Sequence, residues 1–389
     1  MNKLLCFFVG MSFLVSCGGK QPKVDKVIED GVEVVLNHLE PYRVPNEPSE
    51  LSLEKEYVID AEDPGLLKAG LSDIRQFGVD SHGYVYLTQA PRKDENLIFK
   101  FDNSGRILKS FGRFGQGPGE ITGTSYFGVN SLDEIVAVDA GSRKLLYFAS
   151  SGEMSRELLF SRTFIGVIMP LETGNFLLPE NQDPTTSGDV EASLSLLNSR
   201  FEKIRTFCRL KYPSFPKETE KINAYLPTPT GTFGADRVYL GIPGEDYEVL
   251  VYDLEGTLLR KIRKDYEPVD VTSSFQKKVL ASAPKGSPIA ERIYFPDHKP
   301  AYQYFFTDES GRLFVMTSEI DKTSGQNISD IFSSSGVFIG RVAVGYFDRL
   351  RLIFEGMSLD VVAKNEHIYV LHEKENGYKE LVAYKAIWR

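Results

Sequence analysis

Short apolar runs that each follow a polar turn recur along the chain of 389 residues. The apolar residues have the two-residue period of a β-strand, and the turns contain Gly, Asn or Asp, which adopt the positive φ of tight hairpins. Six segments share this turn-and-strand pattern: residues 80–87, 131–138, 172–178, 234–240, 308–315 and 364–371. The pattern predicts a chain built from β-hairpins.

A second apolar run with its own polar turn follows each of these segments. The second runs span residues 98–105, 146–152, 194–200, 250–256, 331–336 and 381–385. Two hairpins make one unit of four antiparallel strands, which in the first unit are predicted at 74–79, 84–89, 97–101 and 107–111. The third unit departs most from the pattern, because Arg200 stands where the other second turns carry Gly.

The six units predict a closed ring. Residues 51–389 allow about 56 residues for each unit, against roughly 40–50 for a compact propeller blade, so we expect long loops. The last unit lacks a fourth strand, which residues 53–60 can supply and thereby close the ring. A linear solenoid is the alternative, but the units lack distinct end caps. The predicted fold class is all-β, a six-bladed β-propeller of four-stranded antiparallel blades.

The first residues have the pattern of a cleaved export signal. Lys3 precedes an apolar run at 4–15 that is too short for a permanent membrane helix. The sequence Leu14-Val15-Ser16-Cys17 resembles the lipobox of bacterial lipoproteins, which implies a signal peptide at 1–16 and a lipid on Cys17. Residues 17–50 are interpreted as a lipidated tether with one strand-like piece at 32–36, and residues 51–389 as the propeller. The alternative is a buried N-terminal strand with an incidental cysteine.

The same resemblance implies a cellular location. Gly18 replaces the Asp that marks inner-membrane retention in many lipoproteins, so the outer membrane is expected, with the periplasmic and surface-facing leaflets both open. Removal of Cys6 and lipidation of Cys17 would leave Cys208 without a disulfide partner. We therefore expect packing to stabilise the chain.

The whole pattern resembles the six-bladed propeller lipoproteins of Bacteroidetes and, more distantly, NHL-repeat and TolB-like propellers. The resemblance rests on Cys17, on residues 79–87 and 101–108, and above all on the Phe-Gly-Arg-Phe-Gly-Gln-Gly-Pro-Gly-Glu stretch at 111–120. It implies a fold more than an activity. The formal net charge of -9 argues against a partner held by a basic surface, such as a nucleic acid.

Ligands of such propellers usually occupy the face formed by the blade-to-blade loops and the loops between the second and third strands. Those loops are predicted at 90–96, 112–125, 180–191, 209–230, 264–304 and 345–357. The longest is expected to contain a helix at 275–282, capped by Ser273 or Ser274 and ended by Pro284 and Gly286. Aromatic residues in these loops fit either ligand stacking or loop packing.

The glycine-rich loop supplies the candidate ligand-binding residues Arg113, Gln116 and Glu120. A phosphate cradle is disfavoured there, because Pro118 removes one backbone donor and no Gly-Lys-Ser/Thr follows. A tight structural turn is the competing interpretation. No metal or cofactor is expected, since the five histidines have no HxH or HExxH spacing, and no catalytic residue is assigned.

We therefore expect a lipid-anchored binding or interaction module of the cell envelope, whose ligand is a glycan, a peptide or another envelope protein. A structural subunit of an envelope complex is a third possibility in the same location. The runner-up from another class is a propeller enzyme, such as a lyase or lactonase, that uses the same face.

Overall fold

The recurrent turns connect strands that pair in chain order. In a computed structural model of the chain we describe residues 24–160, 169–171, 174–181, 189–213, 220–225, 230–234, 236–242, 244, 246–282, 290–345 and 361–389. The first blade pairs β4 (Gln76–Val79), β5 (Val85–Thr88), β6 (Asn96–Phe101) and β7 (Ile107–Arg113) in that order. These strands match the predicted ones within two residues at each end.

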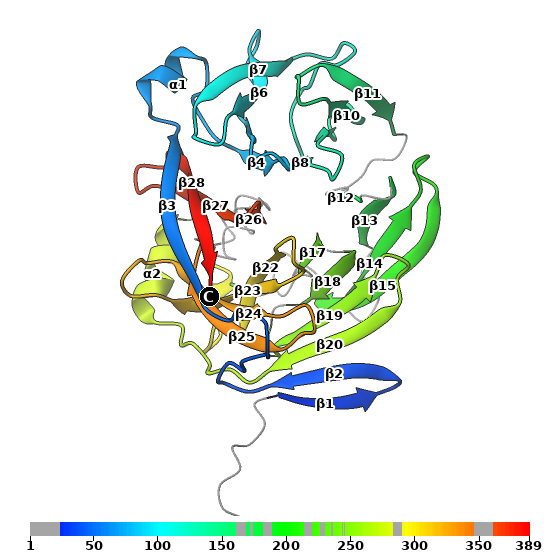
Figure 1. Cartoon of the computed structure of the whole chain (residues 1–389), viewed down its shortest axis with the longest axis vertical. Coiled ribbons are helices and arrows are strands. Elements are labelled where there is room, and N and C mark those ends of the chain that lie inside the picture. Colours follow the sequence, from blue (N-terminus) through cyan, green and yellow to red (C-terminus); the bar gives the residue numbers. More distant parts are fainter. Residues whose placement is uncertain are drawn as a thin grey trace, which may run out of the picture.

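Five further blades complete the ring in Figure 1, where the first strand of each blade lies nearest the centre. Blade 2 contains β8 (Tyr126–Val129), β9 (Ile135–Asp139), β10 (Lys144–Phe148) and β11 (Met154–Leu159). Blade 3 contains β12 (Met169–Pro170), β13 (Phe176–Asn181), β14 (Asp189–Leu197) and β15 (Lys203–Pro213). Blade 4 contains β17 (Thr230–Gly234), β18 (Arg237–Gly241), β19 (Glu248–Asp253) and β20 (Leu258–Lys264). Blade 5 contains β22 (Tyr302–Thr307), β23 (Leu313–Ile320), β24 (Asn327–Phe332) and β25 (Phe338–Ala343).

Blade 6 joins the two ends of the propeller. It contains β26 (Val361–Lys364), β27 (His367–Glu373), β28 (Lys379–Trp388) and, as its fourth strand, β3 (Leu51–Asp60). The register runs antiparallel from Asp60 opposite Glu380 to Leu51 opposite Trp388. This confirms the predicted closure by an N-terminal strand and the predicted six-bladed β-propeller.

The apolar core lies between the blades. Six clusters of buried side chains each join two neighbouring blades; between blades 6 and 1, for example, Tyr369 and Leu381 pack with Phe77 and Phe99. The other five clusters join blades 1 and 2, 2 and 3, 3 and 4, 4 and 5, and 5 and 6. Because the inner strands of a blade are covered on both faces, strands such as β5 and β9 are buried along their whole length.

A side-chain oxygen organises most of the tight turns. In blade 1, Asp102 Oδ1 accepts hydrogen bonds from the backbone N–H groups of Ser104 and Arg106, both at 3.0 Å. The fourth residue of the turn, Gly105, has a φ of +78°. Asp80, Asn130 and Asp308 accept the same pair of bonds in their turns.

The structure of blade 3 corrects the prediction that Arg200 occupies the turn position of the glycines in the other blades. Asn198 Oδ1 accepts from Arg200 N and Glu202 N, so the residue equivalent to Gly105 is Phe201, with a φ of +61°. The Phe201 ring stacks on Phe176 with a centroid separation of 4.9 Å. Packing of the ring can offset the backbone strain of this non-glycine residue.

An N-terminal arm covers the outer edge of the ring. The strand expected at 32–36 is β2 (Val32–Asn37), and β1 (Val24–Glu29) pairs with it in a hairpin that the sequence did not predict. β2 also pairs in parallel with β20, so blade 4 is extended to six strands. Val34 and Val35 are fully buried. Residues 24–37, assigned to the tether, therefore form part of the folded body.

The arm continues along blade 5. Tyr42 N donates to Phe338 O at 2.7 Å, and Ser49 O lies so near Gly340 that an added Cβ would come within 2.5 Å of it. Ser49 N then donates to Arg389 O at 3.1 Å, just before β3 begins. The arm thus covers strand edges that would otherwise be free for pairing with another chain.

Within the described residues, two helices lie in the connections between blades. α1 (Pro64–Lys68) follows β3 and is capped by Asp63, whose Oδ1 accepts from Gly65 N at 2.7 Å. α2 (Ser273–Ser282) confirms the predicted helix, but its cap is Thr272 and not Ser273 or Ser274. Thr272 Oγ1 accepts from Phe275 N at 3.3 Å. Pro284 and Gly286 lie outside the described residues.

Candidate functional site

Two long blade-to-blade connections, one on each side of blade 4, pair with each other. β16 (Ile222–Asn223), from the connection before blade 4, pairs in parallel with β21 (Ile293–Tyr294), from the connection after it. The bonds Ile222 N to Arg292 O and Ala224 N to Tyr294 O, both 2.9 Å, extend this pairing. We call the described residues 220–225 and 265–301 the cap.

The cap has its own small apolar core. Ala224, Tyr225 and Val279 are buried, and Phe275 of α2 packs against them with its ring parallel to that of Tyr225. Val271 N donates to Asp297 O at 2.9 Å, which closes the base of the connection. A connection of this length with its own packed core is typical of a functional insertion rather than of a simple linker.

A small cavity lies where the base of the cap meets blade 5. It is lined by Tyr266, Glu267, Val269, Pro300, Ala301, Thr317, Ser318, Glu319 and Asp330. Its volume is about 10 Å³, close to the minimum that holds one water molecule. A larger ligand would therefore lie over the cavity rather than inside it.

A β-bulge at the end of β23 shapes the floor of this cavity. The register between β23 and β24 shifts between Met316 and Ile320, so residues 317–319 are not paired with β24. Their polar groups find other partners: Ser318 Oγ donates to Pro300 O at 2.7 Å and Thr317 Oγ1 donates to Ile328 O at 2.8 Å. Bulges often re-aim side chains next to functional sites, and here the bulge brings Glu319 to the cavity.

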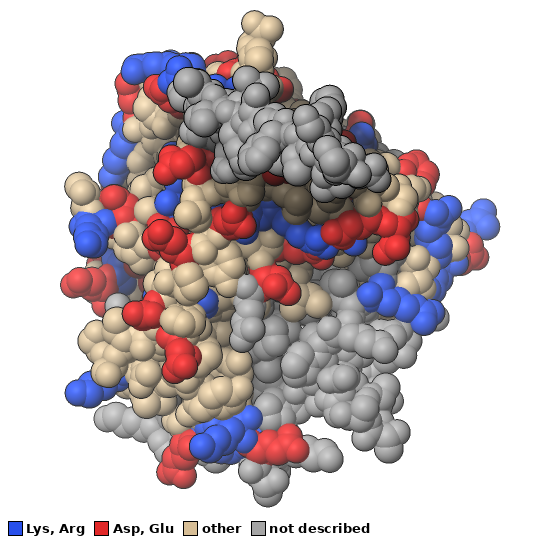
Figure 2. Space-filling model, turned by 90° about the horizontal axis from the view of Figure 1, so that it is seen from below, with Lys and Arg blue, Asp and Glu red and all other residues tan. Residues whose placement is uncertain are grey.

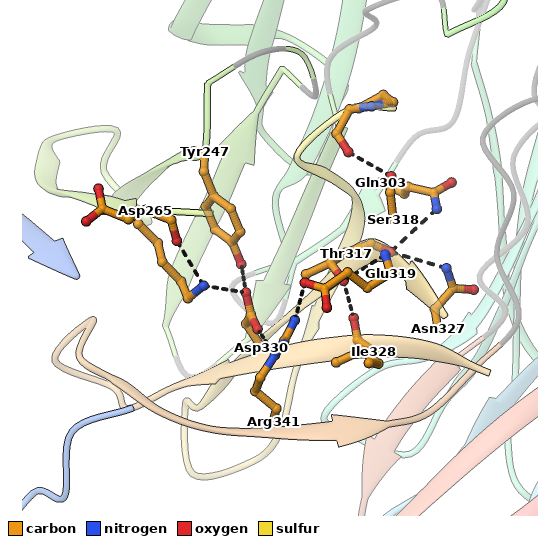
Figure 3. Close-up of polar contacts among 12 residues, drawn as sticks. Tyr247, Asp265, Gln303, Thr317, Ser318, Glu319, Asn327, Ile328, Asp330 and Arg341 are labelled. Atoms are coloured by element: carbon orange, nitrogen blue, oxygen red, sulfur yellow. Dashed lines mark hydrogen bonds and ion pairs between the residues drawn. The ribbon is translucent and has the colours of Figure 1, made fainter. Parts of the chain in front are cut away.

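Asp330 joins three blade strands and a loop beneath the cavity. Its carboxylate accepts from Tyr247 Oη at 2.9 Å and from Arg341 Nε at 2.8 Å, and Lys264 Nζ lies 3.3 Å away. Figure 3 shows Tyr247 and Arg341 reaching Asp330 from different parts of the two blades. Arg341 also pairs with Glu319. Because Asp330 is only 1% exposed, these partners are needed to offset the cost of burying its charge.

The network shifts the protonation of two groups. Burial, together with the negative charge of Asp330, raises the pKa of Tyr247 well above its usual range, so Tyr247 acts as a neutral hydrogen-bond donor. Burial alone would lower the pKa of Arg341, but the carboxylates of Glu319 and Asp330 outweigh it and the pKa is raised. Asp330 is thus a structural junction, whereas the Glu319 side chain is 37% exposed.

The predicted candidates Arg113, Gln116 and Glu120 lie elsewhere, between blades 1 and 2, and none of them lines this cavity. Arg113 forms an exposed ion pair with Asp94 at 3.2 Å. Glu120 folds back over its own loop and accepts from Gly117 N at 2.8 Å. Their binding role stays a prediction, although these contacts also suit a structural role.

Two charged side chains of blade 2 hold the glycine-rich loop in place. Lys144 Nζ donates to the backbone oxygens of Gln116 and Gly117 at 2.9 and 2.6 Å, and Gly119 N donates to Glu157 Oε2 at 2.8 Å. The loop thus presents carbonyl oxygens to a cation of its own chain. This arrangement is unlike a phosphate cradle, which points N–H groups at its ligand.

The described residues contain neither a metal cluster nor a membrane-spanning helix. None of these residues forms a cluster of three or more His, Cys, Asp or Glu side chains suited to a metal ion. Nor does any helix among them have the length and apolar character needed to cross a bilayer. Cys17 lies outside the described part of the chain.

Sequence patterns could not identify most of the residues that line the cavity. Asp330 does leave a signal, because a carboxylate within the apolar run Ile328–Phe332 must be paired if the strand is buried. Its partner Tyr247 is 83 residues away, so no spacing rule could connect them. The bulge at residues 317–319 likewise depends on the register of two strands.

Comparisons with known proteins agree with the architecture. A family model, DUF5128, described as a 6-bladed beta-propeller, matches residues 81–220. A search of curated protein sequences finds no match. A Bacteroides fragilis protein described as exported superposes with a TM-score of 0.50 at 14% identity, covering 91% of this chain and 99% of its own.

Two further solved structures are less similar. A DUF4221 member from Bacteroides vulgatus has 12% identity and a TM-score of 0.48, covering 88% of this chain and 99% of its own. A gluconolactonase from Xanthomonas campestris has 10% identity and a TM-score of 0.41, covering 90% and 99%. Strand pairing and the matched family model lead to one conclusion: the chain is a six-bladed β-propeller.

Proposed function

We propose that this protein is a lipid-anchored binding module of the cell envelope, whose ligand contacts the surface between the cap and blade 5. The observation that carries the proposal is the pairing of two long connections into a folded cap beside a polar cavity. A ring that served only as a scaffold would not need this elaboration on one face.

The lipid anchor is supported by the sequence around Cys17. Leu14-Val15-Ser16-Cys17 ends a short apolar run with a basic start, and Gly18 favours the outer membrane. Residues 1–16 would be removed as the signal peptide. This cleavage would leave every described strand intact, because the first of them begins at Val24.

The chemistry of the surface suits a polar ligand. Glu267 and Glu319 supply carboxylates and Tyr266 an aromatic side chain, and Tyr294 at the rim of the cap is 43% exposed. Carboxylates that accept from hydroxyl or ammonium groups, beside aromatic rings, can bind a glycan or a peptide.

A screen of glycan and peptide arrays with the chain from Cys17 onward, carrying Cys17→Ser, tests the site. We expect a ligand whose affinity falls at least about tenfold in the Glu267→Gln/Glu319→Gln variant, because two ligand contacts are lost. Glu375→Gln, in the 374–378 loop of blade 6, is the matched control and should bind normally. A ligand that is unaffected by the double variant would contradict the site.

Arg113→Ala and Glu120→Ala form a second arm of the same experiment. If the glycine-rich loop binds the ligand, these variants lose affinity and the cap variants do not. Turnover of a lactone or glycan by the wild-type chain would instead favour the enzyme alternative. Palmitate labelling that is lost in Cys17→Ser, together with loss from the outer-membrane fraction, tests the anchor independently of any ligand.

A further inference from the structure

The connection between the proposed lipid and the folded body is short. Residues 18–23 are the only ones between Cys17 and β1, which starts at Val24. Seven Cα steps span at most about 25 Å when fully extended. The tether of residues 17–50 that the sequence suggested would reach several times farther, so docking of the arm changes how the propeller can sit on a membrane.

The arm is fixed to the ring by specific contacts. Arg263 binds both carboxylate oxygens of Glu29 at 2.6 and 2.8 Å, and Arg260 Nε donates to Glu33 at 2.6 Å. Asn37 is buried and bonds to the backbone of blade 5. With Val34 and Val35 in the core, β2 is fixed to the ring, and β1 is held by its pairing with β2 and by the Glu29–Arg263 ion pair.

β1 presents apolar side chains to solvent at this rim. Ile28 is 70% exposed and Val27 40% exposed, on the outermost strand of the six-stranded sheet. Figure 1 places β1 and β2 across the ring from β7 of blade 1. The rim of blade 4 is therefore both the place where the chain leaves the body and an apolar edge.

The charges of this side do not suggest attraction to anionic lipids. Figure 2 views the molecule from the side of β1 and β2 and shows acidic and basic side chains interspersed, with no basic patch in the coloured surface. A polybasic surface would be needed for strong headgroup binding. Any contact with the bilayer here must come from the acyl chains and the apolar side chains.

We infer that the short connection from Cys17 holds the rim formed by β1 against the lipid surface, so that the propeller stands on blade 4 with blade 1 farthest from the membrane. This inference rests on the lipid anchor proposed above. A body of this size is roughly 50 Å across, so blade 1 would lie far outside the reach of the connection. The side of the ring that bears the cap would then stay open to a ligand.

Fluorescent labels on opposite rims test the inference. Ile28→Cys on β1 and Leu108→Cys on β7 replace side chains that are 70% and 51% exposed, so neither disturbs the core. Both are made in a Cys208→Ser background of the full chain, purified with its lipid and inserted into phosphatidylethanolamine–phosphatidylglycerol vesicles. The vesicles carry a spin-labelled lipid that quenches nearby fluorophores.

We expect quenching at residue 28 to exceed that at residue 108 at least about twofold, given the separation of the rims. Equal quenching of vesicle-bound protein would overturn the inference and leave the anchor intact. Greater quenching at residue 108 would place the rim of blade 1 at the membrane and would also overturn the inference. Failure of the chain to bind vesicles would instead refute the anchor.

A variant with a longer connection tests whether the short connection is what orients the propeller. Insertion of about twenty Gly and Ser residues between Gly19 and Lys20 lengthens the connection without touching β1. The difference between the two labels should then shrink while vesicle binding is retained. If the difference persists unchanged, the short connection is not what orients the propeller, and the inference is wrong.

Discussion

The side chain of Asn37 closes the turn at Gly336, which lies 299 residues away in the sequence. Asn37 Nδ2 donates to Gly336 O at 3.0 Å, and Asn37 Oδ1 accepts from Phe338 N at 2.8 Å. The same amide group donates to Arg263 O at 3.2 Å. One buried side chain thus joins the arm, blade 4 and blade 5.

Removal of this amide should destabilise the propeller. Asn37→Ala leaves buried backbone groups without partners, so we expect a loss of about 1–3 kcal/mol in the free energy of unfolding. Urea denaturation followed by tryptophan and tyrosine fluorescence measures the loss. Asn103→Ala, at an exposed position of a blade 1 turn, is the control and should change stability by less than about 0.5 kcal/mol. Equal effects of the two variants would refute this role for Asn37.

Glycine is favoured in these turns for two reasons, its tolerance of positive φ and its lack of a side chain, and alanine variants at two positions can separate them. Gly105 and Gly377 both have positive φ, +78° and +85°. A Cβ on Gly377 would meet nothing within 4 Å, whereas one on Gly105 would lie 2.7 Å from the Tyr57 ring. Gly377→Ala should therefore cost about 1–2 kcal/mol from the backbone alone.

Gly105→Ala should cost a further amount of about 1–3 kcal/mol, because the Tyr57 ring must move. Tyr57 belongs to β3, so the extra cost would report on the contact that closes the ring between blades 6 and 1. Chemical denaturation of both variants gives the difference directly. If the two alanine variants are equally stable, the contact with Tyr57 contributes nothing.

The fold could be predicted because its signals are local. The carboxylate of Asp102 and the glycine three residues later define one turn, and the same chemistry recurs around the ring. The closing strand followed from counting the strands of the last unit. In the third unit glycine is a misleading marker of the turn, because the Asn198 side chain accepts the hydrogen bonds that define it.

The arm and the candidate site could not be predicted in this way. Residues 32–36 predict a strand, but the docking of β1 and β2 depends on Asn37 and on ion pairs with β20, whose partners are distant in sequence. The cap forms because two loops pair across blade 4. Such relationships depend on the finished ring, so the sequence indicated long loops but not what they build.

The buried pair of Asp330 and Lys264 should be costly to break. Their side chains are 1% and 4% exposed, so Asp330→Ala leaves a buried ammonium group with one carboxylate fewer, at a cost of about 3–5 kcal/mol. The double variant Asp330→Leu/Lys264→Met should recover much of this loss, since no charge is left unpaired. Thermal and urea unfolding of the single and double variants provide the comparison.

An exposed ion pair supplies the control for that experiment. Arg113 and Asp94 are 63% and 68% exposed, so Arg113→Ala should change stability by less than about 1 kcal/mol. A small effect of Asp330→Ala, close to that of Arg113→Ala, would mean that the junction beneath the cavity contributes little to the joining of blades 4 and 5.

Docking of the arm should weaken as the pH rises through the titration of His38. Its ring lies 2.8 Å from Asp265 and 3.4 Å from Asp25, and hydrogen bonds to these carboxylates, first to Asp265, raise its pKa above 6.5. The protonated form is thus favoured in the folded state. Its contribution is complete below a pH of about 6.5 and disappears as the pH rises through the higher pKa of the folded state.

Because the His38 side chain is 45% exposed, this contribution should stay below about 1 kcal/mol. Hydrogen exchange of the β1 amides, corrected for the intrinsic pH dependence of exchange, should show less protection at pH 8.5 than at pH 5.5. His38→Gln should remove that difference, because glutamine keeps hydrogen bonding but does not titrate. A pH dependence that persists in His38→Gln would assign the effect to another group and refute the role of His38.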